Sequence, residues 1–455
     1  MTTDPRSPVA HDTETDALVA QSGRLFASAD QWEYQGPSPA GQILVKSSST
    51  SPWTLFEQTQ SLRVEETLDS FAVPEDQGMG SGHSLLITHA FVDGRSELQW
   101  LLDRAPSFTE RNAFDLPATV SDVRSFGAHE SGGVWAVYAG VEPTGILRGT
   151  WSPTTHNLTF DPTPELTVAP PGSPGVRSGK VTGFAECAGS LYTSIGTKVF
   201  RRNDANLLPG GPRWTLVYQA APVAAYNSGI RGLTCVTHEG RPSLLLSTEG
   251  NGDVYRLDHL PGGELDSTGT LSPDQPLGGL VPTLEFSPIP AIGHMLATRG
   301  TPVPAAGRGS VAYVIAAYNN FAPVKLGGTD RQAFGFEWAY GGSCPPARIC
   351  GPTAFGAAVF DAAACFAVRT DTGGPSTYAL RCLSGPDFTP SATPGNPIRS
   401  GQALVSVRTI APSPFGDGRL YSGGYDCNFY PADGTAWIGA STLALINTGD
   451  SPTRE

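Results

Sequence analysis

The sequence has little lysine and contains none of the short motifs that mark the commonest catalytic and metal sites. Lysine occurs only four times, so arginine carries most of the positive charge. No Cys-x-x-Cys pair is present, which disfavours a structural zinc site. The GxSxG, HExxH and GxxxxGK(S/T) motifs are also absent. We therefore predict no metal ligands and no cofactor, and leave calcium open for the oxygen-rich segments 249–253 and 426–434, neither of which fits an EF-hand loop.

Long apolar runs are missing as well. No run approaches the roughly 20 residues that a membrane-spanning helix needs. The first 16 residues are polar and acidic, without the apolar stretch of a secretory leader. The net charge of −13 disfavours binding to nucleic acid or to an anionic membrane surface. We therefore expect neither of these as a partner. We expect the protein to be a monomer and to be cytoplasmic, or secreted if a leader has been removed.

Glycine and proline, by contrast, are abundant and evenly spread, with 54 and 40 residues respectively. Glycine costs helix entropy and proline removes a backbone donor, so this composition disfavours a helical protein. Between them lie short apolar runs rich in β-branched and aromatic residues, which is typical of strands separated by turns. With 39% hydrophobic residues over 455 positions, the chain can bury a sizeable core, and we predict an all-β fold.

A pattern of three or four short strands recurs eight times along the chain. Each unit begins with a first strand such as VRSF, VTGF or IRGL, followed by a glycine-rich turn and a second strand that ends in small residues. Third strands follow, and some units add a fourth, such as RWTLVYQ. Units start about 56 residues apart, which suits a four-stranded antiparallel blade. The pattern predicts one domain over residues 15–446, with disordered segments at 1–14 and 447–455.

The number of units depends on ambiguous places in the second half of the chain. The first strand of the sixth unit is taken as GHML (293–296), although PTLEF (282–286) is an alternative. The third strand of that unit is taken as FGFEWAY (334–340), and the seventh unit is taken to start at PTAF (352–355). If the first and last units share one sheet across the termini, the count is seven. We favour eight.

This arrangement resembles β-propellers in general, in which blades of this kind are placed radially and leave only short edges. The resemblance spans almost the whole chain. The GH…WD signature of WD40 blades is absent, paired glycines lack the kelch register, and no sialidase-type Ser-x-Asp-x-Gly-x-Thr-x-Trp box occurs. The resemblance therefore implies an architecture, and it assigns no functional residue.

One position in each first strand is polar. The eight residues at this position are Asp16, Asp69, Arg124, Thr182, Arg231, His294, Thr353 and Arg408. An apolar residue follows two positions later in every unit, and strict alternation would place both side chains on one face. We therefore expect the polar residue at the entrance of its strand, where the backbone is still turning.

In a propeller the first strands line the central channel, so these polar residues predict a ligand site there. Guanidinium groups bind carboxylate, sulfate or phosphate in a bidentate manner. His294 is the member able to exchange a proton near neutral pH. The competing interpretation is structural, with Arg124, Arg231 and Arg408 pairing with Asp16, Asp69 and loop acids to join the blades.

Loops between second and third strands are expected at the same mouth of the channel. They carry aromatic and amide side chains, namely Trp32, Tyr318, Asn319, Tyr425 and Asp426. Flat aromatic rings beside amides suit stacking on a sugar or an aromatic ligand. The simpler alternative is that tyrosine and asparagine stabilise turns. His129 and His238 fall in similar turns at the opposite mouth, and we expect them to be architectural.

The seven cysteines allow two local bridges. Cys365 and Cys382 flank a predicted hairpin that would place them opposite one another, and Cys344 and Cys350 bracket a short loop. Cys187, Cys235 and Cys427 would then remain, and their odd number implies at least one free thiol. Buried free thiols are the alternative for all of these positions.

We predict an enzyme that acts by hydrolysis or elimination on a small anionic or polyhydroxylated molecule at the channel mouth. His294, Tyr425 and Arg231 are the candidate catalytic residues. The candidate substrate-binding residues are Asp16, Asp69, Arg124, Thr182, Thr353, Arg408, Trp32, Tyr318, Asn319 and Asp426. The alternative is a non-catalytic propeller that binds a protein or glycan partner, which would require an exposed apolar or aromatic patch.

Overall fold

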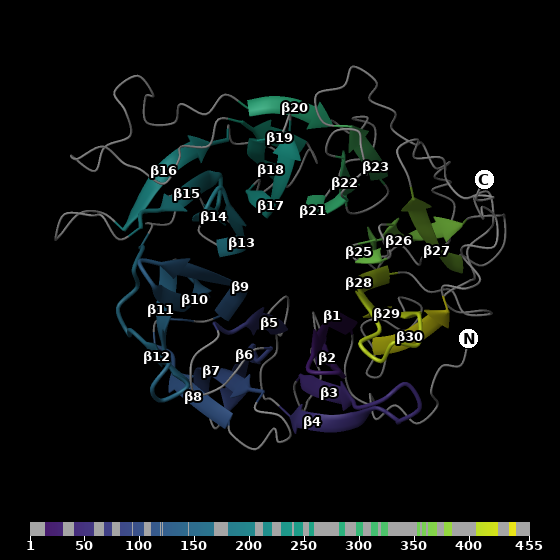
Figure 1. Cartoon of the computed structure of the whole chain (residues 1–455), viewed down its shortest axis with the longest axis horizontal. Coiled ribbons are helices and arrows are strands. Elements are labelled where there is room, and N and C mark those ends of the chain that lie inside the picture. Colours follow the sequence, from purple (N-terminus) through teal and green to yellow (C-terminus); the bar gives the residue numbers. More distant parts are fainter. Residues whose placement is uncertain are drawn as a thin grey trace. The chain divides into compact units, whose positions relative to one another are not determined.

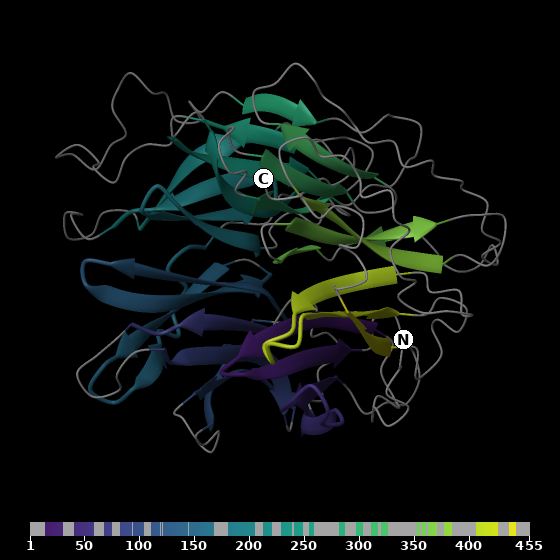
Figure 2. The same cartoon turned by 45° about the vertical axis from the view of Figure 1, so that its right-hand side comes forward.

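The part of the chain that the structure describes is built from β-strands and turns. The computed structural model describes residues 14–30, 41–58, 68–74, 82–92, 94–103, 111–118, 120, 122–143, 145–167, 181–204, 213–220, 229–238, 241–248, 254–258, 282–286, 297–303, 311–316, 320–325, 353–354, 357–360, 363–370, 377–384, 406–425 and 436–442. The described strands form eight sheets, six of them four-stranded (Figure 1, Figure 2). The chain divides into two compact units, and each unit contains four of these sheets. The predicted all-β class is confirmed.

The first unit combines the two ends of the chain and comprises residues 1–75, 79–115 and 335–455. Its first two sheets are β1 (Glu14–Gln21), β2 (Arg24–Asp30), β3 (Gln42–Lys46) and β4 (Thr54–Gln58), then β5 (Leu68–Ala72), β6 (Ser84–Val92), β7 (Arg95–Leu102) and β8 (Arg111–Asp115). Its last two are β25 (Ala357–Phe360), β26 (Ala363–Thr370) and β27 (Thr377–Ser384), then β24 (Thr353–Ala354), β28 (Ser406–Pro412), β29 (Arg419–Tyr425) and β30 (Ala436–Thr442).

The second unit is formed by residues 116–334 together with 76–78. Its four sheets are β9 (Asp122–Ser131), β10 (Val134–Glu142), β11 (Gly145–Ser152) and β12 (Asn157–Phe160); β13 (Val181–Cys187), β14 (Ser190–Ile195), β15 (Lys198–Arg202) and β16 (Trp214–Gln219); β17 (Ile230–His238), β18 (Arg241–Thr248), β19 (Val254–Leu257) and β20 (Pro282–Phe286); and β21 (Ala297–Val303), β22 (Val311–Ala316) and β23 (Asn320–Lys325). The first strands β9, β13, β17 and β21 follow one another along the concave side of this unit (Figure 1).

In three of the described sheets a two-residue turn joins the first strand to the second, namely β1 to β2, β9 to β10 and β13 to β14. Ser22 and Gly23 connect β1 to β2, with φ of 47° and 72°. Gly132 and Gly133 connect β9 to β10, with φ of 60° and 75°. Positive φ at both central residues gives the type I′ geometry, whose twist matches that of the flanking strands. This requirement is one reason why glycine punctuates the repeat.

The core consists of apolar side chains packed between neighbouring sheets. In the first unit, the sheet of β1–β4 packs on the sheet of β28–β30 through a cluster that includes Leu18, Trp53 and Tyr421. We number the eight sheets in chain order. In the second unit, Tyr138 of the third sheet (β9–β12) packs with Trp214 of the fourth (β13–β16), and a further cluster joins the fourth sheet to the fifth (β17–β20). In these clusters the apolar side chains of one sheet are covered by the neighbouring sheet of the same unit.

The predicted strand pattern is confirmed for the first five sheets and for the last. The sheet of β1–β4 is separate from that of β28–β30, so the alternative in which the termini share one sheet is wrong. PTLEF is β20, the fourth strand of the fifth sheet, and therefore does not begin the sixth. Closure of eight blades into one ring, and the disordered termini, stay predictions.

Three strand assignments in the second half of the chain need correction. The first strand of the sixth sheet is β21, which starts at Ala297, just after the expected GHML. Its third strand is β23, whereas the expected FGFEWAY lies outside the described residues. The seventh sheet begins with β25, and the expected PTAF contributes the short β24, which pairs in parallel with β28. Proline-rich spacers blur the repeat in this region, so distance alone misplaced these strands.

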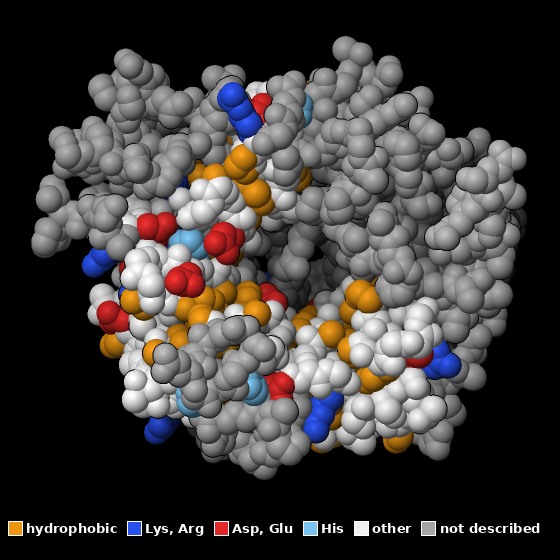
Figure 3. All heavy atoms as spheres, in the orientation of Figure 1, with side chains coloured by type: hydrophobic (Ala, Val, Ile, Leu, Met, Phe, Trp, Pro, Cys, Tyr) orange, Lys and Arg blue, Asp and Glu red, His pale blue; other side chains and the backbone are white. Residues whose placement is uncertain are grey.

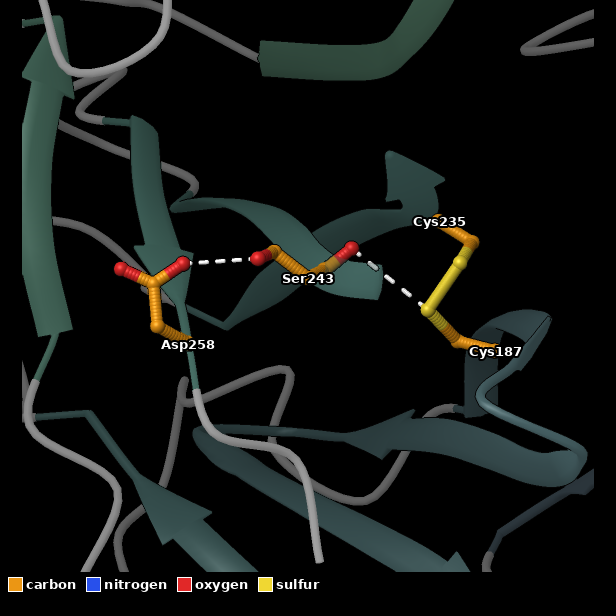
Figure 4. Close-up of a disulfide and its surroundings, with 4 residues drawn as sticks. All are labelled: Cys187, Cys235, Ser243 and Asp258. Carbon is orange, nitrogen blue, oxygen red and sulfur yellow. Dashed lines mark hydrogen bonds between the residues drawn. A yellow bond between two sulfur atoms is a disulfide. The ribbon is translucent and has the colours of Figure 1, made fainter. Parts of the chain in front are cut away.

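One disulfide, between Cys187 and Cys235, joins the fourth and fifth sheets (Figure 4). The sequence analysis placed these two cysteines among the three that remain after the local bridges and did not pair them. They are 48 residues apart in sequence, and only the packing of β13 beside β17 brings them together. Cys365 and Cys382 do lie directly opposite one another in β26 and β27, as predicted. A bond between their sulfur atoms stays a prediction, and the remaining three cysteines lie outside the described residues.

Candidate functional site

A β-bulge lies in six of the eight first strands that the structure describes. In these strands the pairing with the second strand gains one extra residue, whereas β5 and β25 pair without a shift. The extra residues are Asp16, Thr182, Arg124, Arg231 (with Gly232), Arg299 and Arg408. Bulges leave one residue unpaired and re-aim its side chain.

This bulge explains the position of the polar residues. Five of the predicted polar residues belong to bulged strands, and each lies within the first three positions of its strand, at the entrance as expected. They are Asp16, Arg124, Thr182, Arg231 and Arg408. The extra residue breaks the strict alternation, so the polar side chain and the apolar one two positions later need not share a face. In the second sheet Asp69 is different, since it pairs regularly with Ile87 and its carboxylate accepts a hydrogen bond from the Ser70 amide at 2.9 Å.

In the sixth sheet the bulge residue is Arg299 and not His294. Sequence reasoning missed this arginine because it placed the first strand too early. A signal was available, since a β-branched residue, arginine and a small or hydroxyl residue recur at 123–125, 230–232, 298–300 and 407–409. His294 itself lies outside the described residues.

Arg124 is paired within its own sheet. Its residue is 6% exposed, and its Nε lies 3.2 Å from Asp122 Oδ2 and 3.2 Å from Glu142 Oε2. Two carboxylates therefore neutralise this guanidinium. That pairing agrees with the structural interpretation for this position, although the partners are not the Asp16 and Asp69 that we expected.

Hydroxyl groups near the bulges link neighbouring first strands in the second unit. Ser125 Oγ donates to the Val181 carbonyl at 2.8 Å, which ties β9 to β13. Thr182 Oγ1 donates to the Ile230 carbonyl, which ties β13 to β17, and it also contacts Ser194 Oγ at 3.0 Å. Thr182 thus joins two blades.

In the first unit, backbone pairing brings three predicted residues together around β28. Thr353 and Tyr425 both pair with Ser406, one from β24 and one from β29. Arg408 is the bulge residue two positions further along β28. A threonine, an arginine and a tyrosine that are 17 to 72 residues apart in sequence thus lie on adjacent strands.

Strand β1 lies beside this group. The Leu18 amide donates to Thr409 Oγ1 at 3.1 Å, across a sequence separation of 391 residues. The half-buried Asp16 is the bulge residue of β1, as Arg408 is of β28. We define the first-unit site as Asp16, Thr353, Arg408 and Tyr425. These four residues bring a carboxylate, a hydroxyl, a guanidinium and a phenol to adjacent strands.

The remaining predicted residues are not brought to this group by any described contact. Arg231 occupies the bulge of β17 in the second unit. Four predicted loop residues lie outside the described residues, namely Trp32, Tyr318, Asn319 and Asp426. Both oxygen-rich segments considered for calcium also extend beyond them.

A buried charged network between the third and fourth sheets was not predicted from the sequence. His129 Nε2 lies 3.2 Å from Asp204 and its Nδ1 lies 3.3 Å from Glu186 Oε1. Arg202 Nη1 donates to Asp204 at 3.0 Å, and its Nη2 donates to Glu165 at 3.1 Å. Hydrogen bonds to the charged form lower the pKa of Asp204, against the effect of burial. The network joins two sheets, in keeping with the architectural role expected for His129.

The surface of the described residues offers few other sites. Lysine and arginine side chains are spaced singly on the face shown in Figure 3. Leu55, Phe91 and Val134 are the large hydrophobic side chains that are more than a third exposed, and they belong to three different sheets. Within the described ranges no cluster of three or more histidine, cysteine or acidic side chains could hold a metal, and no helix is long and apolar enough to cross a membrane.

Comparison with known proteins gives structural matches only. No family model matches the chain, and no curated protein matches it in sequence. The chain superposes on Sqt1 of Chaetomium thermophilum with a TM-score of 0.52 and 12% identity, over 95% of this chain and 96% of that one. An α-L-arabinofuranosidase of Fusarium graminearum in complex with arabinobiose gives 0.35 and 9%, over 96% and 98%. A mutant puromycin hydrolase gives 0.39 and 13%, over 92% and 60%.

The match to Sqt1 supports the fold. The four-stranded antiparallel sheets and the superposition on Sqt1 over nearly the whole chain show a β-propeller architecture. Two of the structural neighbours are hydrolases, at identities that carry no information about residues or substrate.

Proposed function

We propose that this β-propeller is an enzyme that cleaves a small anionic or polyhydroxylated molecule by hydrolysis or elimination at the first-unit site. The proposal rests on one observation. Backbone pairing gathers Thr353, Arg408 and Tyr425 around β28, and β1 brings the bulge residue Asp16 alongside.

Each side chain of the site has a chemical role in this proposal. The Arg408 guanidinium binds the anionic group of the substrate and stabilises the negative charge that develops during cleavage. The Tyr425 hydroxyl donates a proton to the leaving oxygen. The Asp16 carboxylate accepts a proton from the attacking water in hydrolysis, or from the carbon next to the leaving group in elimination. Thr353 donates a hydrogen bond that orients the substrate.

The contrast with Arg124 supports the choice of Arg408. Two carboxylates neutralise Arg124. Asp122 lies two positions before the bulge on β9, and Glu142 is its pairing partner on β10. At the equivalent positions around Arg408 the chain has Ser406 and Tyr425, which are uncharged at neutral pH. The sheet of β28 therefore carries no carboxylate at the two positions that hold Asp122 and Glu142 in the sheet of β9.

The test is a substrate panel applied to the wild type and to matched variants. The panel contains 4-nitrophenyl glycosides, 4-nitrophenyl phosphate and sulfate, and trigalacturonate followed by ultraviolet absorbance of the unsaturated product. We expect Arg408→Ala to lower kcat/KM by about 10²–10³ and Tyr425→Phe to lower kcat by about 10²–10⁴, with little change in Tm. His294→Ala and Arg231→Ala, assayed in parallel, test the other predicted catalytic residues.

Arg419→Ala is the matched control. Arg419 begins β29, the strand that ends at Tyr425, and it pairs with Asp417 while its side chain is 39% exposed. This variant should keep activity within twofold. Equal losses in Arg408→Ala and Arg419→Ala would contradict the proposed site. Wild-type protein that binds glucuronate in calorimetry but turns over no member of the panel would favour the non-catalytic alternative.

A further inference from the structure

Arg201 of the fourth sheet is buried without a counter-charge from the described residues. Arg201 lies in β15, is 1% exposed, and is the largest fully buried side chain among the described residues. A guanidinium is always charged in proteins. Removing a charge from water costs several kcal/mol unless an opposite charge or a full set of acceptors replaces the water.

The hydrogen bonds of Arg201 are incomplete. Its Nε donates to Ser190 Oγ at 3.2 Å, and Ser190 is itself fully buried. Among the described residues, no acceptor lies within hydrogen-bonding distance of Nη1 or Nη2. These two groups carry four N–H donors, which is most of the donor capacity of the side chain.

Tyr192 adds a further donor at the same place. It pairs directly with Arg201 across β14 and β15, so the two side chains lie next to one another on one face of the sheet. Its hydroxyl also lacks a partner within the described part of the chain. Burial raises the pKa of Tyr192 to about 12, so the hydroxyl keeps its proton at neutral pH and can donate it.

Other buried arginines of the second unit show what is missing. Arg124, Arg202 and Arg256 each contact a carboxylate at 2.7–3.2 Å. Asp204, which comes three positions after Arg201, is already bonded to His129 and Arg202. The structure therefore places a positive charge and unpaired donors together, without an acceptor from the described chain.

The surroundings limit what could fill this place. Tyr192 belongs to an apolar cluster that packs the fourth sheet on the fifth and includes Leu233, Leu244 and the disulfide residue Cys187. Arg201, Tyr192 and Ser190 are 1%, 0% and 0% exposed, so no large ligand has access. A balancing group must be small, carry one negative charge and accept several hydrogen bonds.

We propose that Arg201 and Tyr192 bind a monovalent anion of the size of chloride between the fourth and fifth sheets. The anion accepts hydrogen bonds from Nη1 and Nη2 of Arg201 and from the Tyr192 hydroxyl. Its role is structural, since it neutralises a charge inside the interface between two blades. This inference does not depend on the proposed reaction, because Arg201 lies in a different unit from the first-unit site.

The experiment measures the Tm of the full chain in sodium gluconate and in sodium chloride or bromide at equal ionic strength. Gluconate is too large for the enclosed place. We expect halide to raise the wild-type Tm by about 2–4 °C, because a ligand that binds only the folded state stabilises it. Arg201→Met should remove this rise, and Tyr192→Phe should reduce it while keeping the charge.

Arg256→Gln is the matched control, since it removes a buried arginine that is paired with Asp258. It should lower the Tm yet keep the full response to halide. If Arg201→Met does not fold, crystals of the wild type grown in bromide decide the question through an anomalous peak beside Arg201. A wild-type Tm equal in halide and gluconate, or a bromide crystal with only water at this place, would overturn the proposal.

Discussion

At the scale of single residues, the interface between the third and fourth sheets is held by buried polar groups that satisfy one another. Glu165 accepts hydrogen bonds from Arg202 Nε at 3.2 Å and from Trp214 Nε1 at 3.0 Å. Arg202 also lies over the Tyr138 ring, 5.3 Å from its centroid. Breaking such a network leaves a buried charge without a partner, so its members depend on each other.

Tyr138 and Tyr192 make the stability of the protein sensitive to alkaline pH. Burial raises the pKa of each to about 12, from 10.0 in the unfolded chain. Both states are protonated below pH 10, where this contribution is fully present, and it is lost as the pH rises toward 12. Between pH 10 and pH 12, we expect each tyrosine to lower the free energy of unfolding by about 2–3 kcal/mol. Urea unfolding at a series of pH values measures this loss.

The double variant Tyr138→Phe/Tyr192→Phe is the control for this expectation. It has no hydroxyl to ionise at either position, so its free energy of unfolding should fall less steeply above pH 10. An unchanged slope in the double variant would show that other groups cause the alkaline loss. Absorbance of tyrosinate, recorded in the same titration, reports whether two tyrosines ionise late.

At the scale of strands, two kinds of link join first strands to each other. Hydroxyl groups beside the bulges donate to carbonyls of the next first strand, as Ser125 and Thr182 do. The disulfide joins Cys187, the last residue of β13, to Cys235 in the second half of β17 (Figure 4). Ser243 continues this contact into β18, since its carbonyl lies 3.5 Å from the Cys187 sulfur and its hydroxyl donates to Asp258 at 2.7 Å.

The double variant Cys187→Ser/Cys235→Ser tests the contribution of this disulfide. Closing a loop of 48 residues restricts the unfolded chain, and the entropy of that restriction corresponds to about 4 kcal/mol. We expect the free energy of unfolding to fall by about this amount in urea titrations. The wild type treated with a reductant should approach the variant, and a variant as stable as the oxidised wild type would refute the estimate.

At the scale of the molecule, the two ends of the chain meet in one unit. Trp53 and Tyr421 pack edge to face, with ring centroids 6.2 Å apart, between the first sheet and the last. The Leu18–Thr409 hydrogen bond lies in the same contact region. The tetrapeptide Gly-Arg-Leu-Phe at 23–26 recurs as Gly-Arg-Leu-Tyr at 418–421. Each copy begins the second strand of its sheet, and these two sheets pack together.

Replacing either aromatic side chain should loosen this closure. We expect Tyr421→Ala to lower the free energy of unfolding by about 3–5 kcal/mol, because it removes a large side chain that is 2% exposed. A double-mutant cycle with Trp53→Ala should give a coupling of about 0.5–1.5 kcal/mol. Leu55→Ala, at a side chain 48% exposed on β4, is the control and should change stability by less than about 0.5 kcal/mol.

The fold was predictable where the repeat is regular. Short apolar strands and glycine turns identified the first five sheets and the last, because both signals are local. The sixth and seventh sheets were misplaced where long spacers hid the register. The correct alignment of Arg299 was available from its neighbours Thr298 and Gly300, which match the triplets at Arg231 and Arg408.

The candidate site was predictable only in part. Asp16, Arg408, Thr353 and Tyr425 were all named from their positions in the repeat, and strand pairing then gathered them around β28. The carboxylates that pair with Arg124 were not foreseen, since Glu142 is 18 residues away in sequence. The bulge was not foreseen either, because a bulge follows from how one strand meets its partner.

By itself, the sequence determined the strand composition, the turn positions and the spacing of the repeat, since these depend on side-chain size and backbone freedom within a few residues. Only the tertiary structure decided which arginines are neutralised, which cysteines are joined and which buried donors lack an acceptor. Those outcomes depend on groups such as Arg124 and Glu142, or Cys187 and Cys235, which are 18 and 48 residues apart in the chain and meet only when strands pair and neighbouring sheets pack.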